Sequence, residues 1–137
     1  MLALDALKGA LPVLLSLHLS AANWLHATVG LAAFLGHVFP VWLRFRGGKG
    51  VATALGVLAV LAPDSAIVGA GVYALLFALF RVSSIGSLAG GICALAVSML
   101  RERPVEYQIL TAVLFTLMLY THRGNIQRLL KKTERSV

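Results

Sequence analysis

The residues best suited to chemistry lie in a short polar segment that separates two long apolar stretches. The segment combines cations, glycines and one hydroxyl: Arg44, Arg46, Gly47, Gly48, Lys49, Gly50 and Thr53. Glycine lets backbone N–H groups approach an oxyanion closely, and cations balance its charge. Arg46 can hold a phosphate bidentately, whereas Lys49 acts as a point charge. We therefore predict a site for an anionic substrate.

The residues after the glycines support this interpretation. A helix is expected to begin at Val51, so its positive N-terminal end would face the loop and Thr53 would lie in its first turn. The nucleotide-binding P-loop does not fit, because Leu43 stands where that pattern needs glycine and Gly50 where it needs serine or threonine. A simpler alternative is a flexible loop whose cations only orient the chain in a membrane.

Two other polar clusters could complete the site. Ser83 and Ser84 stand at the expected start of a helix, where hydroxyls either cap the helix or, beside a phosphate loop, act as ligands. His122 and Asn125 are three residues apart and share a face if the helix continues. An imidazole suits deprotonating or orienting a hydroxyl nucleophile, although a histidine at a membrane edge can also be purely interfacial.

Metal and thiol chemistry are not expected. His18, His26 and His37 show no ligand spacing to one another. The lone cysteine, Cys93, lies in an apolar run and excludes an internal disulfide framework. We predict neither a metal nor a cofactor.

Composition indicates that these clusters are positioned by membrane-spanning helices. The chain is 59% hydrophobic and 12% charged, with a mean hydropathy of +0.88. Six apolar segments are predicted to be helices: Leu4–Leu19, Trp24–Leu43, Val51–Ala62, Ile67–Phe80, Ile85–Leu100 and Tyr107–Tyr120. The predicted fold is thus an all-α polytopic membrane protein in one domain, 1–137. The third segment spans only about 18 Å, so either the bilayer thins there or the glycine loop before it lies below the membrane surface in a polar cleft.

The charges predict the orientation. If the segments alternate in direction, ten of the 12 Lys and Arg residues lie on one face, and only Arg101 and Arg103 lie on the other, next to Glu102 and Glu106. The positive-inside rule makes the first face cytoplasmic and puts both termini inside. This asymmetry explains the net charge of +7 without nucleic acid, and the basic tail can contact membrane lipids. Asp5 and Lys8 are expected to form an internal ion pair.

The run from Gly36 to Thr53 resembles the central motif of the bacterial acyl-phosphate:glycerol-3-phosphate acyltransferases of the PlsY type. That motif has a Gly-His-x-Phe-Pro element followed by an Arg/Lys-Gly-Gly-Lys-Gly-Val-Ala-Thr loop. Similar elements occur at 5–9 (Asp-x-x-Lys-Gly), 83–85 and 122–126. The resemblance covers nearly the whole chain in order.

The resemblance implies an enzyme of the bacterial inner membrane, with its active site facing the cytoplasm. It would transfer a fatty acyl group from acyl phosphate to the sn-1 hydroxyl of glycerol 3-phosphate, giving lysophosphatidic acid and phosphate. The residues implied to bind substrate are Arg46, Gly47, Gly48, Lys49, Gly50, Thr53 and Ser83. Those implied to line the acyl-transfer centre are Ser84, His122 and Asn125.

The chain departs from the family pattern at its start. The family has a further N-terminal helix and a Gly/Ser/Asn-rich motif before the position of Asp5. We therefore expect the sequence to be N-terminally incomplete. The alternative is an inactive truncated homologue that acts as a membrane scaffold or lipid-binding protein. A small transporter is a weaker possibility, because no segment carries a charge midway along its length.

Overall fold

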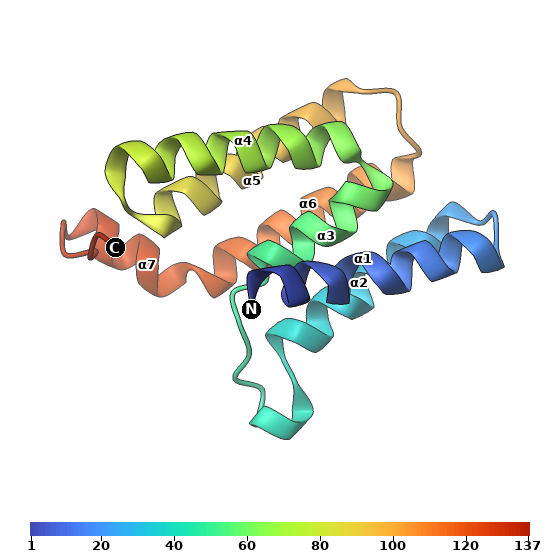
Figure 1. Ribbon diagram of the computed structural model, residues 1–137, viewed down its shortest axis with the longest axis horizontal. Coiled ribbons are helices and arrows are strands. Elements are labelled where there is room, and N and C mark those ends of the chain that lie inside the picture. Colours follow the sequence, from blue (N-terminus) through green and yellow to red (C-terminus); the bar gives the residue numbers. More distant parts are fainter.

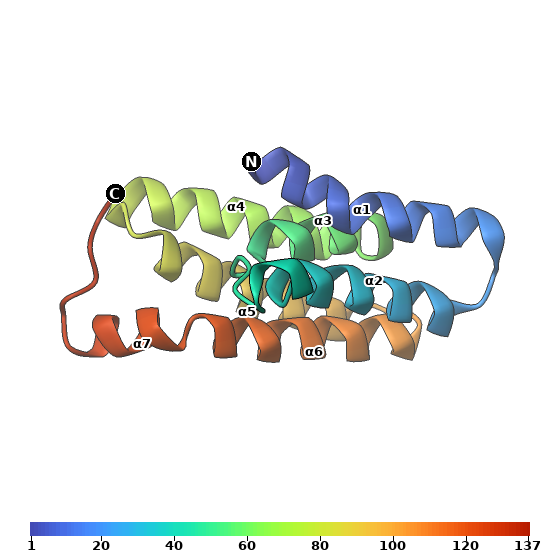
Figure 2. The ribbon, with the colours of Figure 1, turned by 90° about the horizontal axis from the view of Figure 1, so that it is seen from below.

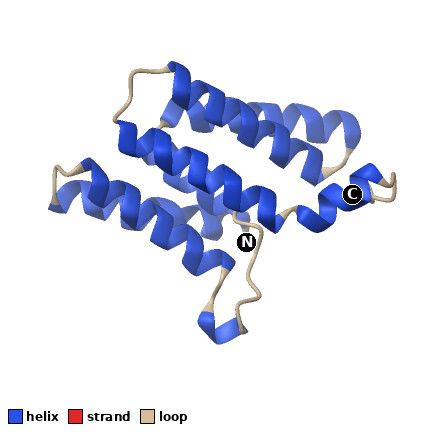
Figure 3. Ribbon diagram, turned by 180° about the vertical axis from the view of Figure 1, so that it is seen from behind, coloured by secondary structure: helices blue, strands red, loops and turns tan.

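The structure is a computed structural model that describes residues 1–137. Figure 3 shows helices joined by loops, with no strand. The helices are α1 (Leu2–Leu19), α2 (Asn23–Val38), α3 (Val51–Leu61), α4 (Pro63–Phe80), α5 (Ser83–Leu100), α6 (Val105–Thr121) and α7 (Arg123–Leu130), with a 3-10 turn η1 (Val41–Leu43). The predicted all-α class is confirmed.

Four stretches are long and apolar enough to cross a membrane, namely Leu2–Leu19, Asn23–Leu43 (α2 together with η1), Pro63–Phe80 and Ser83–Leu100. The helices α3 and α6 are apolar but shorter. Two boundaries differ from the prediction by several residues, and α7 was not among the six predicted segments. The helix α2 ends at Val38, because Pro40 has no N–H to continue the helix, and residues 39–50 form a loop instead. The helix α4 begins at Pro63 rather than at Ile67, since proline is tolerated in the first turn of a helix.

The helices α1 to α6 alternate in direction, and α7 continues in the direction of α6 (Figure 1). The turns after α1, α3 and α5 therefore lie at one end. The α4–α5 turn and the C-terminal segment lie at the other, and the loop 39–50 faces that same end (Figures 1 and 2). We call the second end the loop end. The same loop extends sideways from the bundle, across the helix axis (Figure 1).

Close packing of α4 on α5 depends on small residues. A Cβ on Gly90 would lie 2.6 Å from the Gly69 carbonyl oxygen, and one on Gly86 would lie 2.9 Å from Tyr73. Glycine therefore lets the two helices approach closely, because small residues four apart leave room for the neighbouring backbone. The main apolar core lies on the other side of α3, where Val13, Phe34 and Val57 are fully buried.

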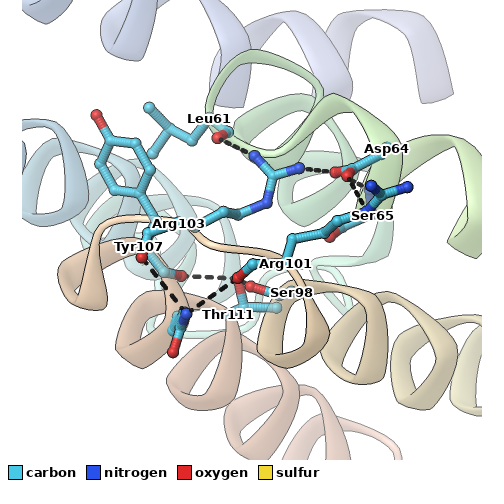
Figure 4. A network of polar contacts seen from close by, with 9 residues as sticks. Leu61, Asp64, Ser65, Ser98, Arg101, Arg103, Tyr107 and Thr111 are labelled. Atoms are coloured by element: carbon cyan, nitrogen blue, oxygen red, sulfur yellow. Dashed lines mark hydrogen bonds and ion pairs between the residues drawn. The ribbon is translucent and has the colours of Figure 1, made fainter.

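The end opposite the loop end is held by ion pairs around Asp64 (Figure 4). Arg103 pairs with Asp64 and donates to the Leu61 carbonyl oxygen at 3.2 Å, and Arg101 Nε lies 3.2 Å from the same carboxylate. Glu102 and Glu106 stand close to these arginines in the sequence but form no ion pair with them. Asp64 lies in the first turn of α4, whereas Arg101 and Arg103 lie in the loop after α5. These ion pairs therefore join the α3–α4 turn to the α5–α6 loop.

Candidate active site

A cavity of about 580 Å³ lies between α3, α4 and α5, and its lining at the loop end includes the glycine loop and the start of α5, which we call its mouth. The ends of α1, α2 and α6 add Asp5, His37 and His122 to its wall. Near the mouth the wall is polar. Further along, small and apolar residues replace the polar ones, so the cavity combines a polar head with an apolar tail.

The glycine loop forms one side of the mouth. Gly50 is the N-cap of α3 and has φ +84°, where a side chain is strained, and a Cβ there would lie 2.3 Å from the Phe34 ring. A Cβ on Gly48 would lie 2.4 Å from His37 Nε2. Close approach of the loop to α2 therefore requires glycine at both positions.

Lys49 lies between these glycines and lines the cavity. Its backbone carbonyl accepts a hydrogen bond of 2.9 Å from Thr121 Oγ1 at the end of α6, which fixes the loop to that helix. Its side chain takes part in none of the ion pairs of the chain. Lys49 thus brings an uncompensated charge to the cavity mouth.

Six of the ten predicted site residues line this cavity, and four do not. Those that line it are Gly48, Lys49, Gly50, Ser83, Ser84 and His122. Arg46 is exposed and lines a separate surface groove with Trp42 and Arg44. The backbone at Gly47 turns away from the cavity, because its N–H donates to the Val38 carbonyl oxygen at 3.1 Å.

Thr53 lies in the first turn of α3, as expected, but it is fully buried and does not line the cavity. Its backbone and methyl group lie against Gly9 of α1, and its hydroxyl makes no hydrogen bond in the protein. The side chain therefore packs α3 onto α1 in this structure.

The two serines do not cap α5, for which no side-chain capping bond forms. Ser83 Oγ lies 3.1 Å from the Tyr73 hydroxyl. Ser84 is buried and donates to Glu134 Oε1 at 3.0 Å. Both hydroxyls therefore contact partners at the cavity mouth.

His122 follows the last residue of α6 and is 1% exposed. Its Nδ1 lies 2.9 Å from the Met118 carbonyl oxygen, which makes Nδ1 the donor and leaves Nε2 with a free lone pair. Burial lowers the pKa of His122 below its ordinary value. The hydrogen bond to Met118 opposes this shift, the charge of Lys49 adds to it, and the charge of Glu134 has the smallest, opposing effect. The imidazole is therefore neutral at pH 7 and can accept a proton.

Glu134, which was not among the predicted site residues, connects several of them. Its Oε1 accepts from Asn125 Nδ2 at 2.5 Å and from Ser84, and its Oε2 accepts from Arg128 Nε at 2.6 Å. These hydrogen bonds, that from Asn125 first, lower its pKa to about 2. Asn125 is thus a buried neighbour of the site rather than part of the cavity wall.

Asp5 and His37 form a second contact that the sequence did not suggest. His37 Nδ1 lies 3.6 Å from Asp5 Oδ1, and both side chains line the cavity. The predicted pair with Lys8 is present at 3.2 Å, but the lysine is exposed. Asp5 is the only carboxylate in the cavity wall, and its ion-pair partners are Lys8 and His37 rather than Lys49.

The apolar helices and the cavity between them define an integral membrane protein. A family model described as glycerol-3-phosphate acyltransferase matches residues 1–132. A glycerol-3-phosphate acyltransferase of Myxococcus xanthus is 60% identical over 135 residues, which cover 98% of this chain and 70% of the relative. One from Synechococcus elongatus is 40% identical and covered to 66% of its length.

Solved structures agree with these relatives. The crystal structure of PlsY in its glycerol 3-phosphate form matches 99% of this chain and 68% of its own, with a TM-score of 0.94 and 36% identity. The lysophosphatidic acid form matches with the same TM-score and 37% identity. The chain therefore belongs to the glycerol-3-phosphate acyltransferase family, integral membrane enzymes that transfer an acyl group to glycerol 3-phosphate in phospholipid synthesis.

Proposed function

We propose that this chain takes its acyl group from acyl phosphate and that the polar mouth of the cavity is where the transfer occurs. The observation that carries this proposal is Lys49, whose charge faces the cavity without a carboxylate partner. A free cation beside glycine N–H groups supports binding of a phosphate, and both substrates carry one. Holding two anions together is costly unless cations lie near both.

The proposed reaction needs no covalent enzyme intermediate, because acyl phosphate is already activated. The sn-1 oxygen attacks the acyl carbon, the bond from that carbon to the phosphate oxygen breaks, and phosphate leaves with the bonding electrons. The hydroxyl proton passes to His122 Nε2, which is neutral and free to accept it. Lys49 and the loop N–H groups stabilise the leaving phosphate.

The remaining predicted residues receive supporting roles in this proposal. Ser83 and Ser84 orient a substrate oxygen at the mouth, and Asn125 acts through Glu134, which it holds against Ser84. Arg46, Gly47 and Thr53 are not assigned a contact with the reacting atoms, because their side chains and backbone lie outside the cavity wall. No cofactor takes part.

We further propose that the loop end faces the cytoplasm of a bacterial cell and that the enzyme lies in the inner membrane. Most cations, among them the exposed Lys131 and Lys132, lie toward this end, which fits the positive-inside rule. The acyl chain would lie along the apolar part of the cavity, between helices and in continuity with membrane lipids.

The proposal is tested with Lys49→Ala, using Lys131→Ala as a matched control at the same end. In lipid nanodiscs with palmitoyl phosphate and glycerol 3-phosphate, we expect turnover to fall about a hundredfold in Lys49→Ala and to stay unchanged in the control. Lysophosphatidic acid and released phosphate are measured together. Equal turnover of Lys49→Ala and wild type would contradict the phosphate site.

The same assay separates the enzyme from its alternatives. Turnover with palmitoyl phosphate but not with palmitoyl-coenzyme A supports acyl phosphate as donor. Binding of lysophosphatidic acid with no turnover by the wild-type protein would instead favour a lipid-binding scaffold.

A further inference from the structure

Beyond Ser65, the helix α4 carries a single polar side chain, that of Tyr73. Tyr73 lines the cavity, and its hydroxyl lies 3.1 Å from Ser83 Oγ at the mouth. A tyrosine among apolar residues needs a hydrogen-bond partner for its hydroxyl when that hydroxyl is partly buried. Here the partner belongs to the candidate site, so the phenol is connected to the place where substrate is proposed to bind.

The packing of the Tyr73 ring fixes the position of its hydroxyl. The ring stacks on Phe77, one turn further along α4, with 5.8 Å between the ring centroids and an angle of 3° between the ring planes. It also lies against α5 at Gly86, where a Cβ would be 2.9 Å from Tyr73 Cδ2. Glycine at this position therefore leaves the space that the phenol occupies beside Ser83.

The two serines at the mouth differ in how their hydroxyl protons are used. Ser84 Oγ donates to Glu134 Oε1 at 3.0 Å, and because a carboxylate can only accept, the Ser84 proton is already engaged. Ser83 Oγ has a hydroxyl as its partner, and a hydroxyl can donate as well as accept. Of the two serines, only Ser83 can therefore keep its hydrogen bond within the protein and also donate to a substrate.

An anion at the mouth would fix the direction of the hydrogen bond between Tyr73 and Ser83. A phosphate oxygen is a stronger acceptor than a neutral hydroxyl, so the Ser83 proton points to the phosphate. Ser83 Oγ then offers Tyr73 only its lone pairs, which makes the phenol the donor. Hydrogen bonds that run in one direction polarise one another, so the phenol strengthens Ser83 as a donor.

We propose that Tyr73 is a positioning residue that makes Ser83 a hydrogen-bond donor to a substrate phosphate. The hydrogen bonds run from the Tyr73 hydroxyl to Ser83 Oγ, and from Ser83 to a phosphate oxygen of acyl phosphate or of glycerol 3-phosphate. The inference rests on the proposed binding of substrate at the mouth. Tyr73 acts through Ser83 and is not itself assigned a contact with the reacting atoms.

The experiment is a double-mutant cycle of Tyr73→Phe and Ser83→Ala in lipid nanodiscs with palmitoyl phosphate and glycerol 3-phosphate. Tyr73→Phe keeps the ring and removes the hydroxyl, so we expect kcat/KM to fall about fivefold. Ser83→Ala removes the donor to the phosphate, and kcat/KM should fall about twentyfold. The double variant should stay within about twofold of Ser83→Ala, because the Tyr73 hydroxyl then has no Ser83 hydroxyl to act on.

Tyr120→Phe is the matched control, since it removes the hydroxyl of an exposed tyrosine outside the cavity and keeps the ring against which Arg123 lies. Its kcat/KM should equal that of the wild type. A KM that rises for palmitoyl phosphate in both Tyr73→Phe and Ser83→Ala would assign the hydrogen bond to acyl phosphate. A KM that rises for the acceptor instead would assign it to glycerol 3-phosphate.

The cycle also separates this inference from the proposed function. Unchanged kcat/KM in Tyr73→Phe, or a loss that multiplies with that of Ser83→Ala to about a hundredfold in the double variant, would overturn the role of Tyr73 and leave the proposed function intact. Absence of turnover with acyl phosphate in the wild type would count against the proposed function itself.

Discussion

Two cation sites at opposite ends of the bundle differ in whether the protein supplies a carboxylate partner, although Arg128 at the loop end is also ion-paired, to Glu134. At the end opposite the loop, Arg101 and Arg103 share Asp64, and Arg103 also bonds the end of α3 through the Leu61 carbonyl. At the loop end, Lys49 reaches the cavity mouth without a carboxylate partner, and His122 beside it is neutral. The difference separates charges that the fold has already satisfied from one left free for an anionic substrate.

Removing Asp64 should have the largest effect on stability, because it takes away the carboxylate that both arginines share. In Asp64→Ala, two arginines lose their counter-charge at a partly buried corner, so we expect the free energy of unfolding to fall by about 2 kcal/mol. Thermal unfolding in detergent measures this. Glu102→Ala is the control, because Glu102 is exposed and forms no ion pair.

Activity should respond differently from stability in the same variant. Turnover per folded Asp64→Ala molecule with lauroyl phosphate should remain within about twofold of wild type, since Asp64 itself does not line the cavity. An equal loss of stability in Glu102→Ala would show that the ion pairs of Asp64 contribute no more to stability than an unpaired carboxylate nearby. A variant of full stability with no activity would move Asp64 into the catalytic machinery.

The pH dependence of kcat/KM tests the proposed site at the loop end. His122 must be neutral to accept the hydroxyl proton, and burial holds its pKa below the ordinary value of 6.5. Lowering the pH protonates the base, so kcat/KM should decrease on the acid side with a midpoint below 6.5, about tenfold for each further pH unit.

Two variants test whether this decrease of kcat/KM at low pH (the acid limb) is caused by protonation of His122. His122→Gln should have low turnover and lose the limb, whereas His18→Gln changes an exposed histidine and should keep it. Substrate phosphate also titrates in this range, so an unchanged limb in His122→Gln would assign the titration to the substrate.

The helices could be predicted from the sequence, but the orientation of their polar side chains could not. Hydropathy located all six apolar segments, because spanning helices need long apolar runs. The glycine loop was also recognisable, because few other residue types allow such close backbone approach. Glu134 was missed since its partner Ser84 is fifty residues away and only the return of the chain past α7 brings them together.

Thr53 shows the same limit most clearly. Its place in the first turn of α3 was predicted correctly, yet the side of α3 that faces the cavity depends on how α1 packs against α3. Gly9 on α1 leaves space for Thr53 there. Gly9 and Thr53 are 44 residues apart in the sequence, so periodicity alone could not predict their contact.

Thr53→Val gives the smallest expected effect and tests this assignment directly. Valine has nearly the same shape and removes a buried hydroxyl that makes no hydrogen bond in the protein, so the free energy of unfolding should change by less than about 0.5 kcal/mol or rise. The KM for glycerol 3-phosphate and for palmitoyl phosphate should also stay unchanged, because Thr53 lies outside the cavity wall. A raised KM for either substrate, at unchanged stability, would restore Thr53 as a substrate ligand and show that the loop end rearranges when substrate binds.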